Sequence, residues 1–99
     1  MNHLYKYTTD VSELCKQHHV KTLYAFGSVL TDKFNSDSDV DLIVAFNNMP
    51  VEDYADNYFD FKFSLQDVLQ RSVDLLEEQA IKNPYFRQHI DHNKQLIYG

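Results

Sequence analysis

The sequence predicts one α/β (α+β) domain, because stretches with helical and with strand character alternate along it. Two short runs, Val20–Phe26 and Val40–Phe46, are apolar and rich in β-branched or aromatic residues, as buried strands are. Other stretches carry apolar residues every three or four positions, as in helices that cover a sheet. Ninety-nine residues suffice for one hydrophobic core but not for a second lobe, so we expect residues 1–99 to form a single domain.

A first helix is expected before the first strand. It begins at Thr9 or Asp10, where Asp10 and Glu13 have the spacing of a capping box, and it ends at His18-His19. Its apolar face consists of Val11, Leu14 and Cys15. After the strand and its Gly-Ser turn, residues 29–38 are expected to contain one helical turn and then a polar loop.

A long helix is expected over residues 51–70. Its apolar face repeats at helical spacing and consists of Val51, Tyr54, Ala55, Tyr58, Phe61, Leu65, Val68 and Leu69. Phe59 and Phe63 widen this face, so the helix is either packed between the sheet and its neighbours or exposes a surface for a partner or a second copy of the chain. Lys62 projects into the stripe, where it either extends its ammonium group to water or contacts a nucleotide phosphate.

The last third of the chain is expected to add two strands and a helix. A third strand, Ser72–Leu76, carries Asp74, and residues 77–82 form a short helix or turn. Asn83-Pro84 is a typical start for a helix that runs to about residue 93. A short strand or extended tail over residues 95–98 closes the domain.

Two acids at the mouth of the second strand indicate a metal site. Asp39 and Asp41 are two positions apart, so their side chains point the same way, with Cα atoms about 6.6 Å apart. Two carboxylates aimed at one place repel each other, and a divalent cation such as Mg²⁺ relieves that repulsion. Gly27 and Ser28 end the preceding strand and offer backbone N–H groups and a hydroxyl to the phosphates of a nucleotide. The alternative is a strand start with solvated acids next to an ordinary turn.

The motifs also carry a resemblance to a known family. Gly27-Ser28, ten residues, and then Asp39-Val40-Asp41 resemble the signature of the polymerase-β-like nucleotidyltransferases. Arg71 to Leu75 looks like the strand with the third acid of that family, and residues 83–85 and 96–98 are similar to its C-terminal segment. At this length the chain resembles the minimal nucleotidyltransferases, many of which are antitoxins of HEPN-domain toxins. The resemblance implies a small mixed β-sheet flanked by helices.

The resemblance also implies a reaction and a set of functional residues. Such proteins transfer AMP from ATP to a hydroxyl, in the best-known cases a tyrosine of the HEPN toxin. Asp39, Asp41 and Asp74 would hold two Mg²⁺ ions, or Asp74 would take the proton of the attacking hydroxyl, while Gly27, Ser28 and Lys62 would bind the nucleotide. The chain departs from many relatives in having no Arg after Gly-Ser, where it carries Val29-Leu30-Thr31.

Composition excludes several other classes. A net charge of −6 argues against stable binding to nucleic acid. The single cysteine, Cys15, cannot form an internal disulfide, and no stretch has the length of a membrane span, so we expect a cytoplasmic protein. The five histidines form no convincing metal set.

Two further functions stay open. An antitoxin with weakened catalysis could neutralise its toxin by binding alone. Transfer of a nucleotide to a small molecule is the other alternative, although larger relatives with that activity usually carry an additional helical domain.

Overall fold

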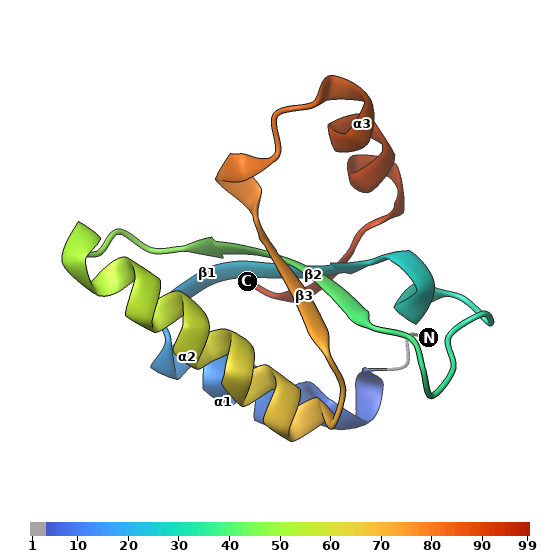
Figure 1. Ribbon diagram of the computed structural model, residues 1–99, viewed down its shortest axis with the longest axis horizontal. Coiled ribbons are helices and arrows are strands. Elements are labelled where there is room, and N and C mark those ends of the chain that lie inside the picture. The colour runs from blue at the N-terminus through green and yellow to red at the C-terminus, as the bar shows by residue number, and fades with distance from the viewer. Residues whose placement is uncertain (1–3) are drawn as a thin grey trace.

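The computed structural model describes residues 4–99, which form four strands, three α-helices and three short 3₁₀ turns (Figure 1). In chain order these are η1 (Tyr5–Tyr7), α1 (Thr8–Gln17), β1 (Val20–Phe26), η2 (Gly27–Leu30), β2 (Val40–Phe46), α2 (Val51–Leu69), β3 (Val73–Glu77), η3 (Glu78–Ala80), α3 (Pro84–Asn93) and β4 (Gln95–Tyr98). The expected order of helices and strands is confirmed, and β1 and β2 have the expected bounds.

The four strands form one mixed sheet in the order β3-β2-β1-β4. β1 is antiparallel to both β2 and β4, whereas β2 and β3 are parallel. Parallel neighbours need a crossover, and α2 supplies it between β2 and β3. The register pairs Phe26 with Asp41 and Asp41 with Asp74, so the end of β1 and the starts of β2 and β3 meet at one end of the sheet.

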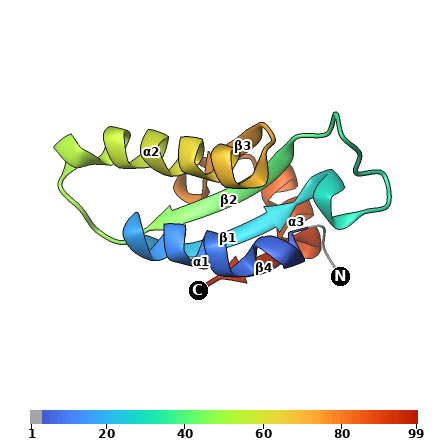
Figure 2. The same ribbon diagram turned by 90° about the horizontal axis from the view of Figure 1, so that it is seen from below.

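α1 and α2 cover one face of the sheet and enclose the core (Figure 2). Val40, Leu42 and Val44 of β2 point into this core, whereas Asp41 points to the other face of the sheet. The helices contribute side chains that are at most 3% exposed, namely Val11, Cys15, Phe61, Leu65 and Leu69.

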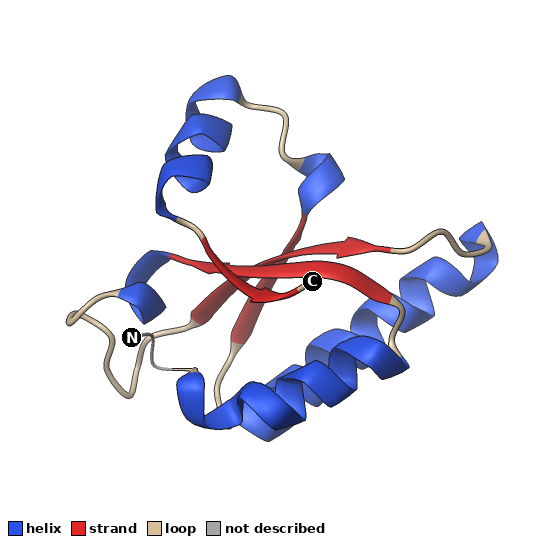
Figure 3. Ribbon diagram, turned by 180° about the vertical axis from the view of Figure 1, so that it is seen from behind, coloured by secondary structure: helices blue, strands red, loops and turns tan. Residues whose placement is uncertain are grey.

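α3 lies on the opposite side of the sheet from α1 and α2 (Figure 3). The Phe86 ring packs edge-on against Phe26 of β1, with 6.4 Å between ring centroids, and Lys94 lies 4.3 Å from the centroid of the Tyr24 ring. α3 begins where the sequence predicts, since the Asn83 side chain accepts hydrogen bonds from the backbone N–H groups of Tyr85 and Phe86.

Two details of the expected helices are wrong. α1 begins at Thr8, after a 3₁₀ turn, and its first turn has no side-chain cap, so the capping box of Asp10 and Glu13 does not form. Val51 and Ala55 of α2 are exposed, Val51 to 86%, because the first turn of the helix lies beyond the end of the sheet (Figure 1). Within residues 4–99, no helix has both the length and the apolar character that a membrane crossing requires.

Candidate active site

Three aspartates meet on the face of the sheet that α1 and α2 leave free. Asp41 and Asp74 are register partners on the parallel strands β2 and β3, where backbones lie about 4.8 Å apart. Asp39 directly precedes β2, two residues before Asp41. β2 and β3 are neighbours in the sheet, and this places Asp74 beside Asp41. We refer to Asp39, Asp41 and Asp74 as the three-aspartate group.

The Gly27 turn lies against this group. Gly27 has a φ of +78°, a conformation that residues with a side chain rarely adopt. A Cβ atom added there would lie 2.6 Å from Oδ2 of Asp41. Glycine therefore satisfies two requirements at once, the left-handed turn after β1 and the close approach of the backbone to a carboxylate. Ser28 follows at the start of η2, and its carbonyl oxygen accepts from the Thr31 N–H and hydroxyl at 2.9 and 3.0 Å.

The three-aspartate group carries more negative charge than its surroundings balance. Partial burial raises the pKa of Asp41, and the charges of Asp74 and then Asp39 raise it further. The ionised form of Asp41 thus costs folding free energy in the absence of a cation. Such an arrangement is typical of functional carboxylates rather than of residues selected for stability.

The chemistry of this donor set fits a hard divalent cation. Carboxylate oxygens are the ligands that Mg²⁺ prefers, and a bound cation would offset both the burial and the like charges of Asp74 and Asp39 that raise the pKa of Asp41. As the side chains stand, no group of three or more His, Cys, Asp or Glu residues within the described part of the chain is arranged to enclose a metal ion. The group would therefore hold Mg²⁺ together with oxygens from another source, and nucleotide phosphates are the usual one.

Arg71 holds the loop that leads to Asp39, a contact that sequence reasoning missed. Its guanidinium donates to the backbone carbonyls of Asn35 at 2.7 Å and Ser38 at 3.1 Å, and lies 4.1 Å from the centre of the Phe34 ring. Because Arg71 is three residues before Asp74, these bonds connect the loop before Asp39 to the start of β3, which carries Asp74. The sequence indicates this contact only by an arginine next to the strand that carries Asp74. The residues that accept its hydrogen bonds cannot be recognised by type, because the bonds go to backbone carbonyl oxygens.

Lys62 is not brought into the three-aspartate group. It lies on α2 between Tyr58 and Gln66, one turn from each, and makes no hydrogen bond or ion pair within residues 4–99. The Tyr58 hydroxyl donates to the Leu75 carbonyl, and the Gln66 side chain accepts from a backbone N–H of β3. Lys62 therefore lies along the free edge of β3, whereas Asp74 of that strand points to the face away from α2.

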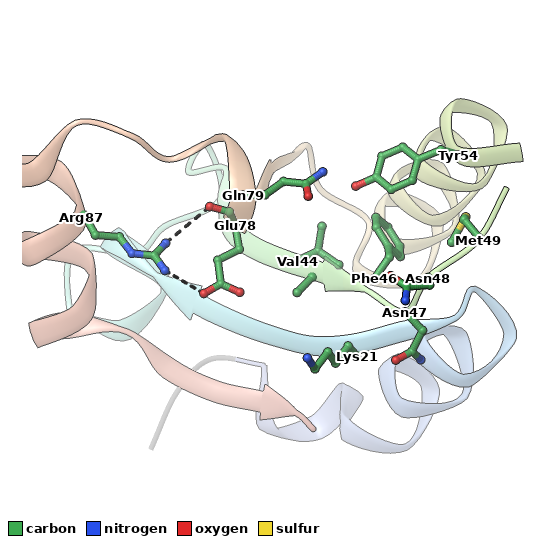
Figure 4. Close-up of a pocket in the computed structure, with 11 residues that line it drawn as sticks. Lys21, Val44, Phe46, Asn47, Asn48, Met49, Tyr54, Glu78, Gln79 and Arg87 are labelled. Carbon is green, nitrogen blue, oxygen red and sulfur yellow. Dashed lines mark hydrogen bonds and ion pairs between the residues drawn. The ribbon is translucent and has the colours of Figure 1, made fainter. Parts of the chain in front are cut away.

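A cavity of about 420 Å³ lies at the other end of β2 (Figure 4). Its wall includes Phe46, Lys21 and Arg87, and Arg87 pairs with Glu78 at 2.8 Å. Phe46 is five residues from Asp41, or about 16 Å along the strand. The cavity contains none of the predicted site residues.

A small mixed sheet that presents three acids beside a Gly-Ser turn defines a nucleotidyltransferase of the polymerase-β type. The chain belongs to this family, because the sequence model of the protein family described as "Polymerase beta, Nucleotidyltransferase" matches residues 9–99. The resemblance and the fold class inferred from the sequence are both confirmed.

Individual relatives agree with this assignment. A Methanocaldococcus jannaschii protein named as a protein adenylyltransferase is 36% identical over 85 residues, covering 86% of this chain and 82% of its own. A solved structure described as a minimal nucleotidyltransferase superposes with a TM-score of 0.76 at 27% identity, covering 93% of this chain and 90% of that one.

Two solved complexes share the fold at lower identity. A toxin–antitoxin complex with AMP-PNP has a TM-score of 0.72 at 17% identity, covering 93% of this chain and 73% of that one. A complex of a tri-AMPylated Shewanella oneidensis HEPN toxin with its MNT antitoxin has a TM-score of 0.67 at 16% identity, covering 96% and 71%.

Proposed function

We propose that this nucleotidyltransferase is a Mg²⁺-dependent protein adenylyltransferase that moves AMP from ATP to a tyrosine hydroxyl of a cognate HEPN toxin, and so acts as an antitoxin in the cytoplasm. The observation that carries the proposal is the three-aspartate group against the Gly27 turn. The adenylyltransferase name of a relative and the AMPylated toxin in a neighbouring structure support AMP as the group and a HEPN protein as the acceptor.

The proposed step is an in-line displacement at phosphorus. The tyrosine oxygen forms a bond to the α-phosphorus of ATP, the bond from that phosphorus to the bridging oxygen breaks, and pyrophosphate leaves. Asp39, Asp41 and Asp74 would hold the two Mg²⁺ ions, which would stabilise charge on the attacking and leaving oxygens. Asp74 is exposed on the edge strand β3, so an incoming hydroxyl can reach it and give it the proton.

The backbone at Gly27 and Ser28 would position the phosphates. With no Cβ at Gly27, the turn can lie directly against the Asp41 carboxylate, and this would keep its backbone N–H groups near phosphates bound at the three-aspartate group. The Ser28 hydroxyl makes no hydrogen bond within residues 4–99 and is free to donate to a phosphate oxygen. Lys62 on the flank of β3 remains a proposed nucleotide contact that would need the substrate to extend past the sheet edge.

The acceptor is tested by mass spectrometry. The protein is incubated with Mg²⁺, ATP and the protein encoded beside it, and we expect the partner to gain the mass of one or more AMP groups on a tyrosine. Replacement of that tyrosine by Phe should abolish the gain. Modification of a serine or threonine instead, or of small molecules only, would contradict the proposed acceptor.

Neutralisation by binding alone is the second candidate, favoured by the lack of an Arg after Gly27-Ser28. A variant with both Asp39→Asn and Asp41→Asn separates the two, because it retains the surface of the protein while losing its ligands for Mg²⁺. If this variant still neutralises the toxin fully, binding is the working mechanism. If it leaves the toxin active, catalysis is required.

A further inference from the structure

Another cavity lies between the end of β3 and the start of α3. It has a volume of about 300 Å³, at the lower limit for small-molecule sites. Four of its seven lining side chains are apolar, namely Leu76, Ala80, Ile81 and Phe86. Phe86 is 39% exposed, so its ring has surface left for a bound group. The cavity therefore suits a small apolar group such as an aromatic ring.

Two residues of the wall connect this cavity to the three-aspartate group. Leu76 follows Asp74 by two residues on β3, so the two side chains point to the same face, with Cα atoms about 6.6 Å apart. Phe86 packs edge-on against Phe26, which is the register partner of Asp41. A tyrosine side chain has a similar reach, so a phenol ring in the cavity can bring its hydroxyl to Asp74.

The sheet order places the cavity and the Gly27 turn on opposite sides of Asp41. Asp41 lies on the inner strand β2, Gly27 follows β1 on one side, and Leu76 lies on β3 on the other. In an in-line displacement, the attacking and leaving oxygens lie on opposite sides of the phosphorus. Because the proposed function places the phosphates at the Gly27 turn, the acceptor hydroxyl enters from the β3 side, where this cavity lies.

The polar groups of the wall favour a phenol ring over a nucleobase. The Glu77 carboxylate accepts from the Tyr54 hydroxyl at 2.9 Å, and the Asn83 amide oxygen accepts from the two backbone N–H groups that it caps. Lys82 is exposed. A buried adenine would need partners for its ring nitrogens and its amino group, whereas a phenol has one polar atom, which would reach out of the cavity toward Asp74.

We propose that this cavity binds the ring of the acceptor tyrosine and so selects a phenolic hydroxyl over the hydroxyl of serine or threonine. The inference rests on the proposed function for the reaction and adds the site that holds the acceptor. With its ring against Leu76 and Phe86, the tyrosine presents its oxygen at Asp74. A serine side chain would leave the cavity empty and gain none of this burial.

Ala80→Trp fills the cavity without removing a side chain from its wall, and Gln79→Trp is the matched control. Gln79 is the preceding residue, is also exposed, and lines the cavity at the other end of β2 instead. We expect Ala80→Trp to lower kcat/KM for the partner at least about tenfold, the effect of losing the burial of an aromatic ring, and to leave the KM for ATP unchanged. Gln79→Trp should behave like the wild type. An equal rise in the KM for ATP, or no change in either value, would overturn the assignment.

A binding measurement without catalysis tests the site separately from the proposed function. para-Cresol, which is the tyrosine side chain as a free molecule, is titrated into the protein and followed by NMR. We expect the amide signals of Leu76, Ile81 and Phe86 to shift in the wild type and in Gln79→Trp, but not in Ala80→Trp. Shifts caused by adenosine in place of para-cresol would contradict the assignment. Protein that binds para-cresol here but modifies no partner would contradict the proposed function and leave the ring site standing.

Discussion

Gly27→Ala tests the close approach of the turn to the three-aspartate group. The added Cβ would lie 2.6 Å from Oδ2 of Asp41, whereas real Cβ atoms essentially never come within 3.0 Å of another heavy atom. The carboxylate must therefore move by at least 3.0 − 2.6 = 0.4 Å. Ligand positions in metal sites are defined to about 0.2 Å, so a shift of this size weakens metal binding. Rotation of a flexible carboxylate costs little, and the loss of stability comes mainly from the backbone.

The expected loss of stability follows from the φ of +78° at Gly27. For a residue with a Cβ, the left-handed backbone conformation costs about 1–2 kcal/mol of free energy. In a domain of this size each kcal/mol lowers the melting temperature by about 4–8 °C. We expect thermal unfolding to show a fall of this order and a Mg²⁺ titration in the presence of nucleotide to show weaker binding.

A double-mutant cycle separates the two effects. In an Asp41→Ala background the contact with the carboxylate is absent, so Gly27→Ala should lower stability only by the cost of the left-handed backbone conformation. Any further loss of stability when Gly27→Ala is made in the wild type measures the coupling between Gly27 and Asp41. Wild-type melting temperature and Mg²⁺ affinity in Gly27→Ala would refute the reasoning.

Three further predictions follow from the structure. Burial and two neighbouring carboxylates raise the pKa of Asp41 above its usual 3.8, so without Mg²⁺ the free energy of unfolding should fall as the pH rises through this raised pKa. Asp41→Asn should remove this fall and raise the melting temperature at pH 7. The same variant should no longer be stabilised by Mg²⁺ with nucleotide. Arg71→Ala and Arg71→Lys, which lose the bonds to two carbonyls, should raise the Mg²⁺ concentration needed for half-saturation, whereas Arg87→Ala, the control, should change the melting temperature alone. Asn83→Ala should lower stability by about 1 kcal/mol in denaturant unfolding, because it removes the cap of α3.

Much of the fold was predictable because local patterns and packing agree. β1 and β2 are short apolar runs that stop at Gly27 and Asn47, so their bounds could be predicted to the residue. The start of α3 follows from Asn83-Pro84, a signal that depends only on neighbouring residues. α1 differs because the turn at Tyr5–Tyr7 leads directly into it, and the chain therefore enters the helix before Asp10 can cap it.

The parts of the site that could not be predicted depend on contacts between distant segments. Arg71 bonds to carbonyl oxygens 36 and 33 residues away, and no side-chain pattern reports a bond to backbone. Conversely, Lys62 lies in the predicted helix, but its position depends on how α2 packs against the edge of β3, which periodicity does not define.

The most direct test of the account is transfer of label from α-³²P-labelled ATP to the partner protein by four forms of the chain. The wild type and Asp37→Asn, an exposed acid of the same loop, should label the partner in the presence of Mg²⁺. Asp39→Asn and Asp41→Asn should each lower the rate by at least about a hundredfold, as loss of charge stabilisation in a transition state does. Undiminished labelling by Asp39→Asn and Asp41→Asn would contradict the assignment of the three-aspartate group as the catalytic centre.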